Sequence, residues 1–174
     1  MRRRTLLLGP LALLGAGAAL AASPLRFDDI VIHHSGGGSG DPEMLRQVHR
    51  DRQPHDPIDM IPYHFLIGNG RGMKDGEVHA TGRWRWRLWG AHMSANHTGL
   101  NISAIGICVI GNFEVAQVSE AQFAALETLC RDLMARYRIT VEHVGFHGHF
   151  EREATACPGR NFPHERLIAA LGVG

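Results

Sequence analysis

The chain has 174 residues and a formal net charge of +1, with 44% apolar and 20% charged residues. The apolar fraction is too high for a disordered chain, and the length suits one domain with its own core. The near-neutral charge excludes a strongly basic protein that tracks phosphates, so no nucleic-acid partner is expected. Twelve histidines and three cysteines are a first indication of a metal site, because both residue types bind zinc.

The N-terminal residues are predicted to be an export signal. Arg2 to Arg4 precede an uncharged run from Thr5 to Leu20, and Ala19 to Ala21 offers a small-x-small cleavage site. The paired arginines are typical of a bacterial twin-arginine signal. An uncleaved membrane anchor is the alternative, but a proline and several glycines weaken a spanning helix. Cleavage removes residues 1–21 and three of the 18 basic residues, so residues 22–174 carry 15 basic and 17 acidic residues, a net charge of −2.

The first half of the remaining domain is predicted to contain strands and one helix. Phe27–His33 contains the β-branched run Ile30–Ile32 and favours a strand that runs into a glycine-rich loop. Asp41 and Pro42 are typical of a helix N-cap and first helical position, and this helix is expected to end near Arg52. Two further short strands are expected at Tyr63–Ile67 and Glu77–Thr81.

The second half has the clearest helix. Ala104–Ile110 is a small and apolar run that favours a central strand covered on both faces. Ser119 to Gln122 forms a capping box, and apolar residues follow it at helical spacing. A strand near Val144–His147 and a last helix from Pro163 complete the chain. This order predicts an α/β (mixed) domain with a single central mixed β-sheet flanked by helices.

Three sequence groups carry residues suited to chemistry. They are His33-His34 at a strand end, Tyr63-His64, and His149 followed by Cys157-Pro158-Gly159. A catalytic zinc commonly takes three protein ligands and leaves a fourth position open. The spacing of His149 and Cys157 suits a loop that folds back, but it is not a selective pattern. Strand alternation lets only one of His33 and His34 face a site, and does not say which.

Five short segments taken together indicate a protein family more specifically than the spacing of His149 and Cys157 does. They are Ile30–Ser35, Ile61–Ile67, Gly90–His92, Ser103–Ile107 with Gly111–Phe113, and Gly148–Gly159. In this order they resemble the zinc-dependent N-acetylmuramoyl-L-alanine amidases, a family that includes the phage-type lysozyme amidases and the peptidoglycan recognition proteins. The resemblance covers nearly all of the domain and implies the amidase and recognition-protein fold.

The resemblance also implies site residues. His33, His149 and Cys157 match the ligands of one Zn²⁺ per chain, whereas His34 matches a position that is not a ligand. Tyr63 matches a catalytic tyrosine. Thr155 matches a position that is lysine in phage enzymes and threonine in catalytic recognition proteins, where it would help to hold the oxyanion. Non-catalytic recognition proteins lack the cysteine, so its presence favours an enzyme.

The implied reaction is hydrolysis of the amide between the lactyl group of N-acetylmuramic acid and L-alanine by a zinc-activated water. The expected partner is peptidoglycan or a muropeptide, in the periplasm or cell wall of a bacterium, with no stable membrane insertion after signal cleavage. Two alternatives remain: a non-hydrolytic peptidoglycan-binding module with a structural zinc, and a metal-independent cysteine peptidase that uses Cys157. The sequence leaves the oligomeric state, the stem-peptide preference and the choice between intact wall and soluble fragments open.

Four residues are candidates for substrate binding. His92 and Asn101 match positions that line the substrate groove of the family. Arg83 and Trp86 belong to the run Arg83–Trp89, in which arginines and aromatic residues alternate. A groove wall and an exposed strand that covers the core are equally good interpretations of this run.

Two cysteines are expected away from the metal. Cys108 falls in the predicted central strand and Cys130 on the apolar face of the long helix. The two could form a disulfide in an exported protein, or remain as two buried free thiols.

Overall fold

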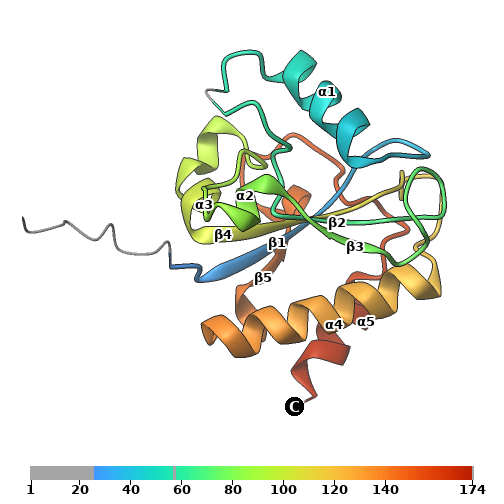
Figure 1. The fold of residues 1–174 in the computed structure, drawn as a ribbon. Helices are drawn as coiled ribbons and strands as arrows, with labels where there is room; N and C mark the ends of the chain where they lie inside the picture. The colour runs from blue at the N-terminus through green and yellow to red at the C-terminus, as the bar shows by residue number, and fades with distance from the viewer. Residues whose placement is uncertain (1–25, 57, 174) are drawn as a thin grey trace, which may run out of the picture.

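A computed structural model of the protein describes residues 26–56 and 58–173, so the predicted export signal at residues 1–21 lies outside the described residues. The domain is built on one five-stranded sheet with the order β3-β2-β4-β1-β5 (Figure 1). The strands are β1 (Asp29–His34), β2 (Phe65–Ile67), β3 (Val78–Ala80), β4 (Ala104–Val109) and β5 (Val144–Phe146). Only β3 pairs in the antiparallel sense, with β2. The predicted mixed α/β sheet is therefore confirmed.

The described α-helices are α1 (Pro42–Arg52), α2 (Gly82–Arg85), α3 (Thr98–Ser103), α4 (Glu120–Tyr137) and α5 (His164–Gly172). Two of the five, α1 and α4, begin at side-chain caps that the sequence predicts. The side chain of Asp41 accepts a hydrogen bond from the backbone N–H of Met44 at 2.8 Å, which caps α1. Ser119 and Gln122 form the predicted capping box at the start of α4.

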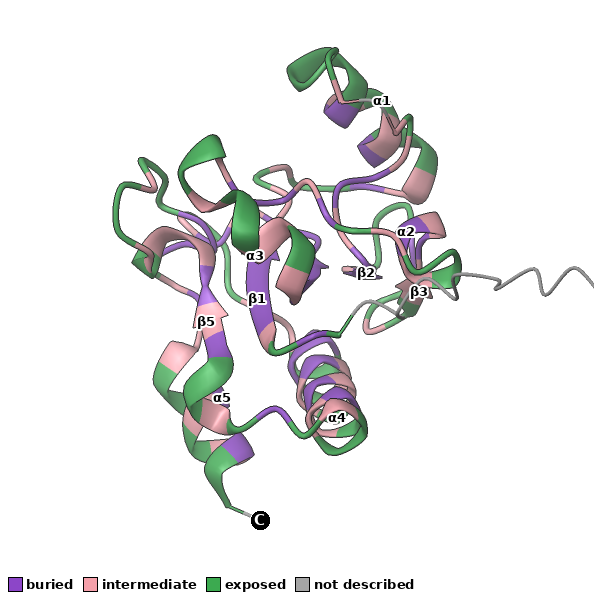
Figure 2. Cartoon of the chain, turned by 90° about the vertical axis from the view of Figure 1, so that its left-hand side faces the viewer, coloured by how far each residue is buried: buried purple, intermediate pink, exposed green. Residues whose placement is uncertain are grey.

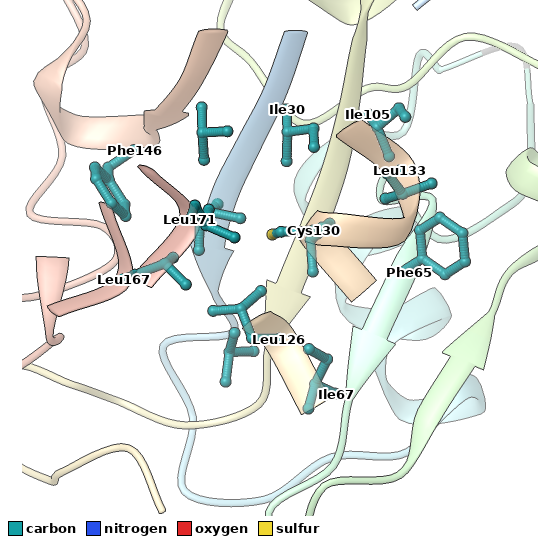
Figure 3. Close-up of a cluster of buried hydrophobic side chains, with 14 of the residues drawn as sticks. Ile30, Phe65, Ile67, Ile105, Leu126, Cys130, Leu133, Phe146, Leu167 and Leu171 are labelled. Atoms are coloured by element: carbon teal, nitrogen blue, oxygen red, sulfur yellow. The ribbon is translucent and has the colours of Figure 1, made fainter. Parts of the chain in front are cut away.

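The main core lies between the sheet and the pair α4 and α5. Figure 3 shows Leu126, Cys130 and Leu133 of α4 against the strands, beside Leu167 and Leu171 of α5. The residues of α4 that face the sheet are buried and those on its outer side are exposed (Figure 2). A smaller apolar cluster of Leu45, Ile61, Leu66, Met73, Cys108 and Ile110 includes one residue of α1. This division leaves the carboxyl ends of the parallel strands free to carry polar side chains.

The sheet separates two of the three cysteines. Cys130 belongs to the main core, whereas Cys108 points into the smaller cluster on the other face of β4. Both are buried free thiols. The structure thus favours the free-thiol interpretation over a Cys108–Cys130 disulfide.

The Arg83–Trp89 run is not the alternating strand that the sequence suggested. Its first residues form α2, and Arg87 adopts a left-handed conformation with φ of 54°. Trp84 packs against the main core, whereas Trp86 is exposed to solvent.

Among the described residues, no helix is long and apolar enough to cross a bilayer.

Candidate metal centre

The pairing of β1 with β5 brings two histidines together. The two strands are parallel, with Ile32 opposite Phe146 in the register. Both of these side chains lie in the main core. Side chains alternate between the faces of a sheet, so the next residues, His33 and His147, point away from that core. Their ring centroids are 4.6 Å apart.

Cys157 completes a cluster of three donors. Its Sγ lies 3.9 Å from Nδ1 of His33 and accepts a hydrogen bond from the backbone N–H of His34 at 3.2 Å. One ligand atom from each of His33, His147 and Cys157 lies within 4.8 Å of the other two. Two imidazoles and a thiol at such distances are a donor set typical of zinc, with room for a fourth ligand.

The two segments that carry His147 and Cys157 meet at Gly148. Its backbone N–H donates to the carbonyl oxygen of Cys157 at 2.6 Å. A Cβ at this position would lie 2.5 Å from the carbonyl oxygen of Thr155, closer than atoms can approach. Glycine is therefore required for the approach that sets His147 beside the cysteine.

Burial fixes the protonation of the donors. Burial, reinforced by the neighbouring His92, holds the pKa of His33 well below its ordinary value, so this imidazole is neutral at pH 7 and keeps a lone pair for a cation. Burial also raises the pKa of the Cys157 thiol to about 12. A metal ion that bound here would have to displace the thiol proton, as zinc does in cysteine sites.

His149 does not lie in the cluster, which corrects the sequence-based expectation. Its ring stacks on His164 with centroids 4.9 Å apart and lies 5.4 Å from the ring of Phe146. The chain leaves β5 in a 3-10 turn, His147–His149. Such a turn has three residues per revolution, so side chains two positions apart point in different directions. His147 therefore replaces His149 as the candidate ligand.

His92 positions His33. Its Nδ1 lies 3.0 Å from Nε2 of His33, on the side of that ring opposite the cysteine. The side-chain oxygen of Asn101 in turn accepts from the backbone N–H groups of His92 and Met93, at 2.8 and 2.9 Å. A Cβ at Gly106 would lie 2.4 Å from the His92 ring, so glycine makes room for it. His92 and Asn101, both predicted to contact substrate, therefore form a hydrogen-bonded chain that ends at His33.

Glu153 supports the other histidine, and the sequence gave no sign of this. Its carboxylate lies 3.1 Å from Nε2 of His147 and accepts hydrogen bonds from the backbone and hydroxyl of Ser94 at 3.1 and 2.8 Å. Burial by itself would raise the pKa of Glu153, but these hydrogen bonds outweigh it and lower the pKa. The ionised carboxylate orients the imidazole, as in many metal sites.

A cavity of about 180 Å³ opens beside the cluster. Tyr63, His92 and His147 line it on the side of the sheet, and α1 contributes Val48 and Arg52. The Tyr63 ring lies 5.1 Å from the His33 ring. Burial, with the nearby Cys108 and Cys157, raises the pKa of Tyr63 well above its ordinary value. The phenol therefore stays protonated and can donate a hydrogen bond.

The remaining predicted site residues have different surroundings. Thr155 is exposed, and its hydroxyl oxygen accepts from the backbone N–H of Cys157 at 3.2 Å. Arg83 is fully buried, and its guanidinium bonds to Asp56 and to the backbone oxygens of Ile61 and Trp89. It has no free face for a substrate. Trp86 does not line the cavity beside the cluster.

The chain is similar to known proteins in both sequence and structure. The sequence matches the family described as N-acetylmuramoyl-L-alanine amidase over residues 23–160. The structure resembles the endolysin N-acetylmuramoyl-L-alanine amidase LysCS from Clostridium intestinale URNW, with a TM-score of 0.70 and 32% identity over 87% of each chain.

Peptidoglycan-recognition proteins are also similar. Protein SC2 of Drosophila melanogaster is 33% identical over 140 residues, which is 78% of this chain and 70% of the relative. The ectodomain complex of the recognition proteins LCa and LCx with bound tracheal cytotoxin gives a TM-score of 0.59, with 26% identity over 79% of each chain. By its sequence match, its fold and its relatives, the chain belongs to the N-acetylmuramoyl-L-alanine amidase family.

Proposed function

We propose that the protein is a zinc-dependent N-acetylmuramoyl-L-alanine amidase that cleaves the bond between the lactyl group of N-acetylmuramic acid and L-alanine. The observation that carries this proposal is the cluster of His33, His147 and Cys157 at the edge of an open cavity. Three protein donors beside a cavity suit a catalytic zinc, whereas a structural zinc usually has four protein ligands.

The chain would hold one zinc ion through Nδ1 of His33, a ring nitrogen of His147 and Sγ of Cys157. Bound zinc would supply a Lewis acid that activates water and polarises the amide carbonyl. His92 and Glu153 would keep the two imidazoles in orientation through their hydrogen bonds. This support reduces the reorganisation that the site needs when charge develops on the substrate.

Tyr63 and Thr155 would act on the substrate. Water adds to the lactyl carbonyl carbon, the bond to the alanine nitrogen breaks, and that nitrogen leaves with a proton as a free amine. The protonated Tyr63 phenol is a poor base but a good donor to the developing oxyanion. Thr155 retains its hydroxyl proton for the same purpose, because in its bond with Cys157 the hydroxyl only accepts.

The cavity suits a peptide that carries carboxylates. Arg52 at the end of α1 is exposed and lines the cavity on the side opposite the sheet. A guanidinium there could pair with a carboxylate of the stem peptide while the lactyl end lies at the metal. A recognition-protein relative was solved with bound tracheal cytotoxin, and we infer peptidoglycan or a muropeptide as the substrate here.

The same site disfavours a cysteine peptidase. Such an enzyme needs a thiolate, commonly formed beside a protonated histidine. Burial here keeps the Cys157 thiol protonated and His33 neutral. A binding module with a structural zinc would have no use for a protonated tyrosine facing the cavity, and the hydrolytic interpretation is therefore preferred.

Purified bacterial wall tests the proposal. The zinc-loaded protein should release new alanine amino termini, and chelation should stop this release. The Cys157→Ser variant should lose at least about a thousand-fold in rate, because Lewis-acid stabilisation is worth several kcal/mol. Cys130→Ser, in the main core away from the cluster, serves as the matched control and should keep the activity.

Each rival predicts a different result. A protein that binds wall and holds zinc but releases no alanine termini would be a binding module. Cleavage that survives complete removal of zinc would indicate the cysteine peptidase. We further propose that the protein is exported and acts in the periplasm or cell wall of a bacterium, where its substrate lies.

A further inference from the structure

A second polar region lies at the opposite end of the sheet from the metal cluster. Two neighbouring cavities of about 860 and 330 Å³ share Arg136 and Tyr137 at the end of α4. Five arginines line them: Arg26, Arg85, Arg87, Arg136 and Arg138. We call this group the arginine surface. Asp28, just before β1, is the one acidic residue that lines either cavity.

The charge of the arginine surface is largely unneutralised. Asp28 pairs with Arg26 at 2.8 Å. The other four arginines are exposed and form no ion pair with an acidic residue in the described part of the chain. The Arg136 guanidinium lies 5.8 Å from the Trp84 ring and 5.7 Å from the Tyr137 ring. Four free guanidinium groups at one end of a domain with slightly acidic composition are complementary to a surface dense in negative charge.

Aromatic residues accompany these arginines. Trp86 stands between Arg85 and Arg87 in the sequence and is 72% exposed, and Trp89 is 45% exposed. An indole so open to water is unusual, because Trp is among the most buried residues on average. Exposed indoles beside arginines are typical of proteins that rest at the interface of a bilayer, where the ring enters the headgroup region.

We propose that the arginine surface, with Trp86, docks the domain on a bilayer of anionic phospholipid. The guanidinium groups would bind lipid phosphates and the Trp86 indole would enter the headgroup layer. A soluble polyanion would satisfy the arginines but would give the exposed indoles no apolar environment. The proposed export signal, residues 1–21, lies close before Arg26 in the sequence, so export through it would bring this end of the domain near the membrane.

Docking in this way would orient the metal cluster. β1 begins beside Asp28 and carries His33 toward its other end. The cavity at the cluster would therefore face away from the bilayer, toward material beyond the membrane. This inference is independent of the amidase proposal, since it concerns residues that touch neither the cluster nor its cavity.

Vesicle binding tests the docking surface. The chain from residue 22 onward keeps both apolar clusters, which draw on residues 27–171, and lacks the uncharged run that would itself bind lipid. It should sediment with phosphatidylglycerol vesicles at low salt, bind phosphatidylcholine vesicles far more weakly, and dissociate as salt is raised. The double variant Arg85→Gln/Arg136→Gln should bind roughly 30-fold more weakly, because each arginine at such a surface contributes about fivefold.

The matched control is Arg46→Gln/Arg50→Gln on α1, which removes the same charge from another face. It should bind the anionic vesicles as the parent does. Trp86→Ser should reduce the quenching of tryptophan fluorescence by brominated lipid. Equal loss in both double variants, equal binding to neutral and anionic vesicles, or preference for soluble poly(glycerol phosphate) over the vesicles would each overturn the proposal. Thermal unfolding of every variant verifies that it is folded.

Discussion

Basic side chains are buried at one end of the sheet and exposed at the other. At the carboxyl ends of β1 and β5, histidines are withdrawn from water, and burial lowers the pKa values of both His33 and His147. At the other end of β1, arginines are exposed, and most of them have no acidic partner among the described residues. Burial removes the proton from an imidazole and makes it a ligand for a cation, whereas exposure keeps a guanidinium charged and able to bind an anion.

Arg83 sharpens this comparison, because it is an arginine that is fully buried. Its guanidinium contacts Asp56, which also lies 2.7 Å from Nε2 of His49. Arg83→Leu should lower the free energy of unfolding by about 3–5 kcal/mol, since it removes the guanidinium that pairs with the buried Asp56 carboxylate. The matched change Arg85→Leu at an exposed position should alter it by about 0.5 kcal/mol or less. Urea denaturation measures the free energy of unfolding of both variants. Equal losses would show that the buried Arg83 guanidinium does not stabilise the fold.

A Tyr63 variant tests whether the end of the sheet with the metal cluster catalyses the proposed hydrolysis. Tyr63→Phe keeps the ring that packs beside His33 and removes only the hydroxyl. We expect kcat for the release of alanine termini to fall about a hundred-fold with little change in zinc content, because one donor to an oxyanion is worth that much. A loss of zinc with the activity, or an unchanged kcat, would remove Tyr63 from the proposed mechanism.

Glu153 tests the support of the ligands. Glu153→Gln keeps a hydrogen-bond acceptor of the same shape but removes the charge that faces His147. Zinc affinity, measured by competition with a chelator, should fall about tenfold or somewhat more. The same substitution at Glu151, which is exposed on the same loop, should leave the affinity unchanged. Equal affinities in the two variants would show that the carboxylate does not support the metal.

The regular elements could be predicted because local signals determine them. Asp41 and Ser119 begin their helices as cap residues should, and Ala104–Val109 is the central strand that its unbroken apolar run favours. The irregular segments could not. Arg83 is buried because Asp56, 27 residues away in sequence, supplies a countercharge, and no local pattern reveals that pairing.

The choice between His147 and His149 shows the same limit. Spacing to Cys157 does not decide between the two, and the resemblance to known amidases favoured His149. The structural reason for His147 is the register of β1 with β5, which sets His33 beside it. A signal was present, since Ile32 and Phe146 are both large apolar residues that precede a histidine at a strand end. The two histidines can be matched in this way only once β1 and β5 are known to be neighbours in the sheet. For the position of His92 against His33, 59 residues apart, the sequence offers no such signal.

Zinc content of two matched variants tests the central claim most directly. His147→Ala and His149→Ala make the same chemical change two residues apart. Metal analysis after exhaustive dialysis should find zinc near one per chain in the parent and in His149→Ala, and little in His147→Ala, because only His147 lies with His33 and Cys157. Retention of zinc by His147→Ala together with its loss from His149→Ala would contradict the metal centre described here.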